Sequence, residues 1–424
     1  MMLILDAWAM ALGAAQGFDV DAATRAYLDS LQGAARARSD AYFEGGYWLI
    51  LWSALVAILV NWVMLRTRWS AAWSERARRM TSRRWLQPAI YSVPFAIVST
   101  LLTLPWTIYS GFVRERQYGL MNLSFMAWLA EQAISLAVTI LLGGIVFMIV
   151  FGVIRNAPRT WWLWGTGAAA MLLALSIMIA PVFIAPLFNT YTPMAPGPLR
   201  DDILAMAREK NVPAENVYVF DQSRQTKRIS ANVSGIGPTV RISLNDNLLN
   251  RATPAEVKSV MGHEMGHYVL SHLPRLVVYN SALVFAALLT LWWLSPRVLE
   301  RFGGRWGVRD VADPAVTPLF AILFIVFGLV TTPVVSTIAR SVEAEADAFG
   351  LDVARQPDGF ARIAMLLSEY RKIEPAAWEE VVFYDHPSGR SRVRMAMEWK
   401  AQHLGELPPE QRGIVRPPPL QPEQ

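Results

Sequence analysis

Two of the chain's five histidines enclose a glutamate in the run Gly262-His263-Glu264-Met265-Gly266-His267. On a helix, residues four positions apart lie on one face, so both imidazoles can bind the same metal ion. Zinc suits such ligands and keeps a fourth position for a water molecule, whose pKa it lowers to about 7. Glu264 is then placed to take a proton from that water as a general base. The run therefore predicts one catalytic zinc ion per chain.

A third protein ligand is expected in the acidic segment 340–350. Helical geometry places Glu343 and Asp347 on one face, whereas Glu345 points about 200° away from Glu343. Glu343 is therefore the candidate zinc ligand. Asp347, one turn later, is expected to accept the free N–H of a ligand histidine and so fix its tautomer. Without a metal, the histidines would be a polar patch and the acids a solvated helix end.

The composition is that of a membrane protein. Of 424 residues, 54% are hydrophobic and 17% are charged, and the mean hydropathy is positive. Six apolar stretches are long enough to cross a bilayer, for which a helix needs about 20 residues. The predicted spans are approximately 47–65, 86–111, 127–154, 160–187, 276–294 and 315–339. The lipid bilayer is thus the first expected partner.

Basic residues gather in short loops beside these spans. Seven arginines and one acid occur between Arg66 and Arg84, which makes this loop cytoplasmic by the positive-inside rule. Alternation of sides then places the polar segment after the fourth span on the periplasmic side of a bacterial inner membrane. Because these loops hold much of the basic charge, the net charge of +5 does not make nucleic acid an expected partner. Zero cysteines exclude disulfides and thiolate ligands.

The polar segment is predicted to be a small α/β insert between spans. A helix is expected over 199–210, a strand over 216–220, and a half-exposed strand over 240–245, where apolar and polar residues alternate. Thr253 and Glu256 have capping-box spacing around Pro254. The helix that carries the two histidines is therefore expected to begin there.

These motifs resemble the type I CAAX prenyl endopeptidases, which are multi-spanning zinc metallopeptidases with His-Glu-x-x-His and a later Glu-x-x-x-Asp. The resemblance covers most of the chain. It includes the run 180–189, the zinc helix, the segment from Glu343 to Asp347, and Asp385-His386-Pro387 followed by Arg392. It implies a peptide or protein substrate that is membrane-associated or prenylated, and spans that enclose a water-filled chamber.

The resemblance also implies roles for two residues beyond the acidic segment. His386 would stabilise the oxyanion or contact the substrate, and Arg392 would lie close to the zinc ligands. A hydrogen-bond donor is required in such a site, because negative charge builds on the scissile carbonyl oxygen in the transition state. A histidine before a proline can also be purely structural, which is the alternative for His386.

The chain departs from the family beside the cleft. Where the family usually has Asn-Ala-Tyr, this sequence reads Ile-Ser-Ala-Asn-Val-Ser-Gly over 229–235. Ser230 and Asn232 are therefore the candidates for holding the substrate peptide. The substrate backbone is expected to pair with the strand near Arg241 to Leu244, as in other cases of strand addition.

The expected fold class is mainly α, a multi-spanning transmembrane helical bundle or barrel with a small α/β zinc-metallopeptidase insert. Its expected parts are a signal-like or amphipathic N-terminal segment (1–45), four spans (46–190), the catalytic insert (191–275), two spans (276–340), a C-terminal catalytic helical segment (341–404) and a disordered, proline-containing tail (405–424).

Two other functions compete with a CAAX-type protease. A heat-shock type membrane zinc protease for quality control shares the motif but typically has fewer spans. A non-enzymatic scaffold or channel with a structural metal would usually fill all four coordination positions with protein ligands. His272 and His403 are interpreted as ordinary polar positions.

Overall fold

The computed structural model describes residues 17–235 and 240–420. The start of the N-terminal segment 1–45 and the last four residues of the tail lie outside the described residues. The chain divides into two compact units, which are described separately. Unit 1 comprises Met1–Tyr47, Asn189–Leu273 and Thr332–Gln424, and unit 2 comprises Trp48–Phe188 and Pro274–Thr331.

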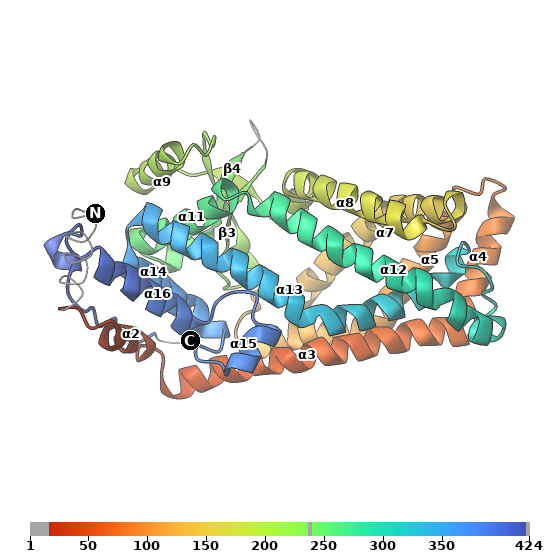
Figure 1. Cartoon of the computed structure of the whole chain (residues 1–424), viewed down its shortest axis with the longest axis horizontal. Coiled ribbons are helices and arrows are strands. Elements are labelled where there is room, and N and C mark those ends of the chain that lie inside the picture. Colours follow the sequence, from red (N-terminus) through yellow and green to blue (C-terminus); the bar gives the residue numbers. More distant parts are fainter. Residues whose placement is uncertain (1–16, 236–239, 421–424) are drawn as a thin grey trace, which may run out of the picture. The chain divides into compact units, whose positions relative to one another are not determined.

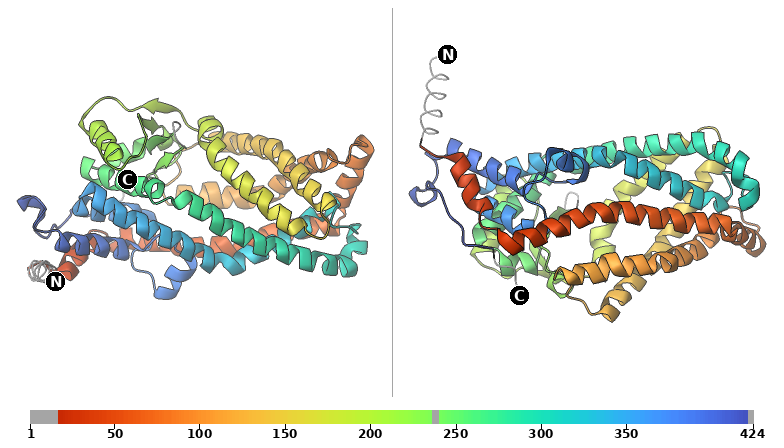
Figure 2. Two further views of the ribbon diagram at one scale, coloured as in Figure 1. Left: turned by 45° about the horizontal axis from the view of Figure 1, so that its top comes forward. Right: turned by 90° about the horizontal axis from the view of Figure 1, so that it is seen from below.

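The predicted membrane spans are confirmed. Within the described residues, six helical segments are long and apolar enough to cross a bilayer. They are Gly33–Arg66, Gln87–Gln117, Phe125–Asn156, Trp161–Leu187, His272–Trp306 and Pro314–Ala354, drawn as long ribbons in Figure 2. Each coincides with one predicted span to within one residue or extends beyond it, because helical hydrogen bonding continues into the polar ends. The chain is an integral, multi-pass membrane protein.

Unit 2 contains α4 (Trp69–Met80), α5 (Gln87–Ile108), α7 (Phe125–Asn156) and α8 (Trp161–Ile179). It also contains most of α12 (His272–Trp306) and the first part of α13 (Thr317–Ala354). Large apolar side chains on these helices are exposed, for example Leu141 at 69% and Val330 at 74%. Such exposure is expected where hydrocarbon rather than water surrounds a helix.

Unit 1 is built on a mixed sheet, whose described strands are β1 (Tyr191–Pro193), β2 (Val217–Phe220), β3 (Ala231–Ser234) and β4 (Arg241–Asn245). Their order is β1-β2-β4-β3, with β2 and β4 parallel and the other pairs antiparallel. The strand predicted over 216–220 is confirmed. The prediction of a half-exposed strand over 240–245 is wrong, because β4 lies inside the sheet and even Ser243 and Asn245 are fully buried.

Helices cover this sheet and build the core of unit 1. They are α2 (Val20–Leu28), the start of α3 (Gly33–Arg66), α9 (Pro198–Glu209), α10 (Asp246–Arg251), α11 (Pro254–Val269), the end of α13, α14 (Pro357–Leu367), α15 (Ala377–Phe383) and α16 (Gly389–Gln402). Figure 1 shows α11, α14 and α16 beside the end of α13. The predicted capping box is present, since Thr253 and Glu256 exchange side-chain and backbone hydrogen bonds at the start of α11.

Helices α11 and α13 approach each other through two glycines. A Cβ atom built on Gly262 would lie 2.9 Å from the carbonyl oxygen of Gly350, and one built on Gly350 would lie 2.8 Å from the backbone nitrogen of His263. Any larger side chain would therefore push the two helices apart. This contact brings the histidines of α11 close to the acids of α13.

The described part of the C-terminal tail, up to Leu420, packs against unit 1, whereas the composition of 405–424 predicts disorder. Leu420 is buried and its backbone N–H donates to the carbonyl of Ser30. Arg362 donates to the carbonyl of Pro418, and the fully buried Lys400 donates to the carbonyl of Gly413. Proline fixes an extended backbone in advance, so this segment loses little conformational entropy when it contacts the domain.

Candidate metal centre

Two imidazole nitrogens meet on one face of α11. His263 and His267 are one turn apart, and their Nε2 atoms lie 3.1 Å from each other. His263 is buried, whereas His267 is partly exposed. The shared face predicted from their spacing is therefore confirmed by the geometry of α11.

Helix α13 brings a carboxylate to the same point. Glu343 Oε2 lies 3.1 Å from His263 Nε2, and Glu343 Oε1 lies 3.7 Å from His267 Nε2. One ligand atom from each of the three residues can be chosen so that all lie within 4.8 Å of one another. Glu343 Oε2 is a buried oxygen that makes no hydrogen bond with the described residues. Two imidazole nitrogens and an unsatisfied carboxylate oxygen fit the N/O ligand set that zinc prefers.

The tautomer of His263 is fixed by Asp347. His263 Nδ1 lies 2.8 Å from Asp347 Oδ1. Arg392 also holds this carboxylate, through Nε to Oδ2 at 2.9 Å and Nη2 to Oδ1 at 2.6 Å. Because Asp347 is paired with Arg392, it accepts the Nδ1 proton of His263, which leaves the Nε2 atom of the ring as the one that can bind a metal ion. The positions predicted for Asp347 and Arg392 agree with this geometry.

The protonation of His263 competes with metal binding. Burial opposes a charge on this ring, but the neighbouring carboxylates of Asp347 and Glu343 outweigh burial and raise the pKa of His263 to about 10. A proton and a metal ion therefore compete for the same Nε2 atom.

Sequence reasoning missed the contact made by His272. This residue is almost fully buried, and its Nδ1 lies 3.0 Å from His267 Nδ1. Its Nε2 lies 3.3 Å from Glu345 Oε2. His272 and Glu345 thus hold the imidazole of His267, as Asp347 holds the imidazole of His263. The interpretation of His272 as an ordinary polar position did not include this role.

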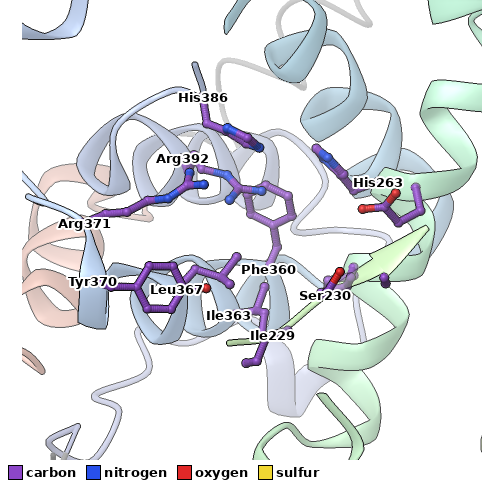
Figure 3. A pocket seen from close by; sticks show the side chains of 14 residues that line it. Ile229, Ser230, His263, Phe360, Ile363, Leu367, Tyr370, Arg371, His386 and Arg392 are labelled. Carbon is purple, nitrogen blue, oxygen red and sulfur yellow. The ribbon is translucent and has the colours of Figure 1, made fainter. Parts of the chain in front are cut away.

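Glu264 and His386 line a pocket of about 210 Å³ beside the ligand atoms. Burial raises the pKa of Glu264, against the opposing effect of the nearby histidines. His386 Nε2 lies 3.2 Å from Glu343 Oε2, and its Nδ1 lies 2.8 Å from Asp385 Oδ1. In Figure 3, His386 and Arg392 project into the pocket opposite His263. The structure therefore brings the predicted base and the predicted oxyanion donor to one cavity.

Only one of the two candidates for substrate binding lines the pocket. Ser230 lines the pocket together with its neighbours Ile229 and Ala231, whereas Asn232 does not line it and pairs with Ser243 across the sheet. The prediction that the strand near Arg241 to Leu244 receives the substrate is wrong, because β4 is paired on both edges. The described edge strand beside the pocket is β3.

One further cation lines the pocket and was not singled out in the sequence. Arg371 lies beside Tyr370 on the wall formed by the end of α14 and the following turn, and its guanidinium points into the cavity (Figure 3). Among the described residues, no hydrogen bond or ion pair of this guanidinium is found. No motif marks Arg371, since a single arginine in a short loop carries no spacing signal.

Comparison with known proteins gives independent support. The model of peptidase family M48 matches residues 195–400, and that of the CAAX prenyl protease N-terminal region, five membrane helices, matches residues 25–190. The uncharacterised metalloprotease YhfN of Bacillus subtilis is 26% identical over 81% of this chain and 80% of its own length. CAAX prenyl protease 1 of Saccharomyces cerevisiae is 29% identical over 59% of each chain.

The crystal structure of S. mikatae Ste24p has the same fold, with a TM-score of 0.75 and 22% identity over 87% of this chain and 90% of that chain. The two family models together reach from the first membrane span to α16 and include every candidate metal ligand. Residues 195–400 match peptidase family M48, and the chain is a membrane-spanning metalloprotease that resembles the CAAX prenyl proteases.

Proposed function

We propose that the protein is a zinc endopeptidase with one zinc ion per chain, held by His263, His267 and Glu343. The observation that carries this proposal is the convergence of two imidazole nitrogens and one carboxylate, with the Nδ1 proton of His263 directed away by Asp347. M48 peptidases are zinc-dependent in general, and three protein ligands keep one position open for chemistry.

Side chains of the protein would perform the proton transfers and stabilise the transition state. Bound zinc would acidify a water molecule and polarise the scissile carbonyl. Glu264 accepts the proton of the attacking water and returns it to the leaving amine, and its raised pKa suits both steps. His386 donates a hydrogen bond to the carbonyl oxygen as negative charge builds there. Asp385, which contacts His386 Nδ1, orients that donor.

The substrate is a peptide or protein that lies beside β3. An extended peptide can add to the edge of β3 that is not paired with any described strand, and it would gain main-chain hydrogen bonds there. Ser230 at the pocket is the better placed of the two predicted contacts, and Asn232 would meet the substrate further along the strand. Delivery from the membrane, with or without a prenyl group, agrees with the spans and with relatives named CAAX prenyl protease 1.

The site opens to the periplasmic side of a bacterial inner membrane in this proposal. Its support is the arginine-rich loop between α3 and α5, which the positive-inside rule assigns to the cytoplasm. A reporter fused at the C-terminus would test the side, since alkaline phosphatase is active only after export.

Zinc content and peptide hydrolysis test the enzyme itself. Purified protein should hold one zinc per chain by elemental analysis, lose casein or peptide cleavage in a chelator, and regain it with zinc. Glu264→Gln should keep the zinc and lose at least about 10²-fold in rate. Glu215→Gln, at an exposed carboxylate of the insert, serves as the matched control. Unchanged hydrolysis by Glu264→Gln, or full zinc affinity in Glu343→Ala, would refute the assignment.

A further inference from the structure

Unit 2 contains a cavity of its own, about 820 Å³ in volume. Its walls are the start of α5, the end of α7 and the loop between α12 and α13. Three arginines reach it, namely Arg78, Arg84 and Arg155. No role in peptide hydrolysis is assigned to any residue of this cavity.

The positive charge of Arg78 is neutralised by ion pairs with two acidic residues. Its Nη1 lies 2.9 Å from Asp313 Oδ2, and its Nη2 lies 2.9 Å from Glu75 Oε2. Asp313 also accepts hydrogen bonds from the Ser74 hydroxyl and the Ala315 backbone N–H. This carboxylate is therefore bonded to local partners, and among the described residues it forms no ion pair with Arg84 or Arg155.

Neither Arg155 nor Arg84 forms a direct ion pair among the described residues. Arg155 is half-buried and donates to two neutral acceptors, the carbonyl oxygen of Ala312 at 3.1 Å and that of Arg84 at 2.5 Å. The guanidinium of Arg84 makes no hydrogen bond or ion pair in the described part of the chain. Arg155 is half-buried and Arg84 is exposed, and their like charges repel each other, so an anion between them would be stabilised by both.

We propose that this cavity binds the phosphate of an anionic glycerophospholipid headgroup between Arg84 and Arg155. Guanidinium groups match phosphate oxygens in a planar, bidentate arrangement, and basic pockets between membrane helices bind such headgroups. The amides of Gln87 and Asn156 add polar groups to the wall. Trp85, also on the wall, is 59% exposed, as suits a ring at headgroup depth.

The position of the cavity favours a lipid over a soluble phosphate. It lies at the ends of α5 and α7, whose apolar faces would accompany the acyl chains of a bound lipid. The first turn of α5 has no side-chain cap, and the partial positive charge at the N-terminal end of a helix favours an anion. Asp310 is the remaining acid of the wall, but it is exposed and accepts a hydrogen bond from Ala312 in its own loop.

Native mass spectrometry of the full-length, delipidated protein tests the proposal. The parent should bind phosphatidylglycerol about tenfold more tightly than phosphatidylcholine, which carries no net charge. Arg84→Gln should reduce that preference to about twofold or less, because one charge-assisted contact accounts for a factor of about ten. Arg83→Gln, at an exposed neighbour that does not line the cavity, should keep the parental preference.

Arg84→Gln is the decisive variant. The Arg84 side chain makes no hydrogen bond or ion pair with the described residues, so the fold does not depend on it. Arg155→Gln removes bonds to two carbonyls and is compared only at temperatures where it remains folded. A phosphatidylglycerol preference that survives in Arg84→Gln, or that falls equally in Arg83→Gln, would overturn the proposal. Inorganic phosphate that displaces the lipid at equal concentration would instead identify a soluble ligand and overturn the lipid assignment.

Discussion

Asp347 and Arg392 form a buried, bidentate ion pair, and the carboxylate of Asp347 also contacts His263. Asp347 is fully buried and Arg392 is 7% exposed. Burial of an ion pair is costly unless its remaining lone pairs are used, and here Asp347 Oδ1 accepts from both Arg392 and His263. The pair therefore links α16 to the metal ligand of α11 through one residue of α13.

Asp347→Asn should weaken zinc binding by about 10- to 100-fold, because an amide loses the charge that holds the His263 tautomer. Competition with a fluorescent chelator measures the affinity. Asp352→Asn lies on the same helix, where Asp352 accepts from Trp399 Nε1 outside the site, and is the matched control. A zinc affinity within twofold of the parent in Asp347→Asn would contradict the role given to this carboxylate.

His272→Ala should speed zinc loss by about tenfold, because His267 would lose the imidazole that contacts its Nδ1. Release of zinc into a chromogenic chelator follows the rate directly and requires no substrate. His403→Ala is the control, since His403 stacks on Trp399 and bonds its carbonyl, away from the ligand atoms. Equal release rates in the two variants would show that His272 is only a packing residue.

The metal ligands and the spans follow from local patterns in the sequence. His263 and His267 are related by helical spacing alone, and the spans by the length of apolar runs. His272 is different, because Ser271 has a φ of +55° in the left-handed region and turns the chain between α11 and α12. That turn returns His272 to His267, which five-residue spacing on a continuous helix would not do.

The position of a strand within its sheet could not be predicted from the sequence either. Alternation over 240–245 indicates a strand with one polar face, but it cannot show which neighbours cover that face. In the sheet, Asn245 caps α10 and donates to the carbonyl of Arg228, so its polar groups are satisfied while buried. The tail likewise has a disorder-prone composition, and its contacts are with residues far away in the sequence, Arg362 at 56 positions from Pro418 and Ser30 near the start of the chain.

Gly350→Ala should lower both stability and peptide hydrolysis. The new methyl group would meet the backbone of His263 at 2.8 Å, and backbone atoms cannot move aside without displacing the helix. Overpacking of this kind costs about 1 to 3 kcal/mol. Thermal unfolding in detergent and kcat on a model peptide report the two effects.

Gly328→Ala is the matched control on the same helix, because nothing lies within 4 Å of the added atom. It should leave unfolding temperature and kcat close to those of the parent. A normal unfolding temperature and normal activity in Gly350→Ala would mean that α11 and α13 tolerate a wider separation than the structure implies.

Deletion of residues 414–424 should destabilise the protein by about 2 to 3 kcal/mol. The deletion exposes the site of Leu420, whose full burial contributes about 1.5 to 3 kcal/mol, and removes the hydrogen bond from Arg362 to Pro418. Urea unfolding followed by tryptophan fluorescence measures the loss. Deletion of 421–424 alone is the control. If the two truncated proteins were equally stable, the contacts of the tail would not stabilise the protein, as the disorder expected from composition implies.

Glu374 should make stability depend on pH. Burial opposes its ionisation, but Arg36 at 2.8 Å, with Arg25 and Arg390, outweighs burial and lowers the pKa of Glu374. A carboxyl whose pKa is lower when folded stabilises the protein above its unfolded value of about 4.3, and this contribution is lost as pH falls through the folded value.

Glu374→Gln should therefore unfold at a lower temperature than the parent at pH 7, and the difference should shrink below about pH 4. The effect should be no more than about 1 kcal/mol, because Arg25 and Arg390 are each 55% exposed and solvent screens them. Glu410→Gln, at an exposed carboxylate, should show no such difference at any pH. A pH-independent gap between Glu374→Gln and the parent would mean that packing, not charge, holds α2 and α3 to this loop.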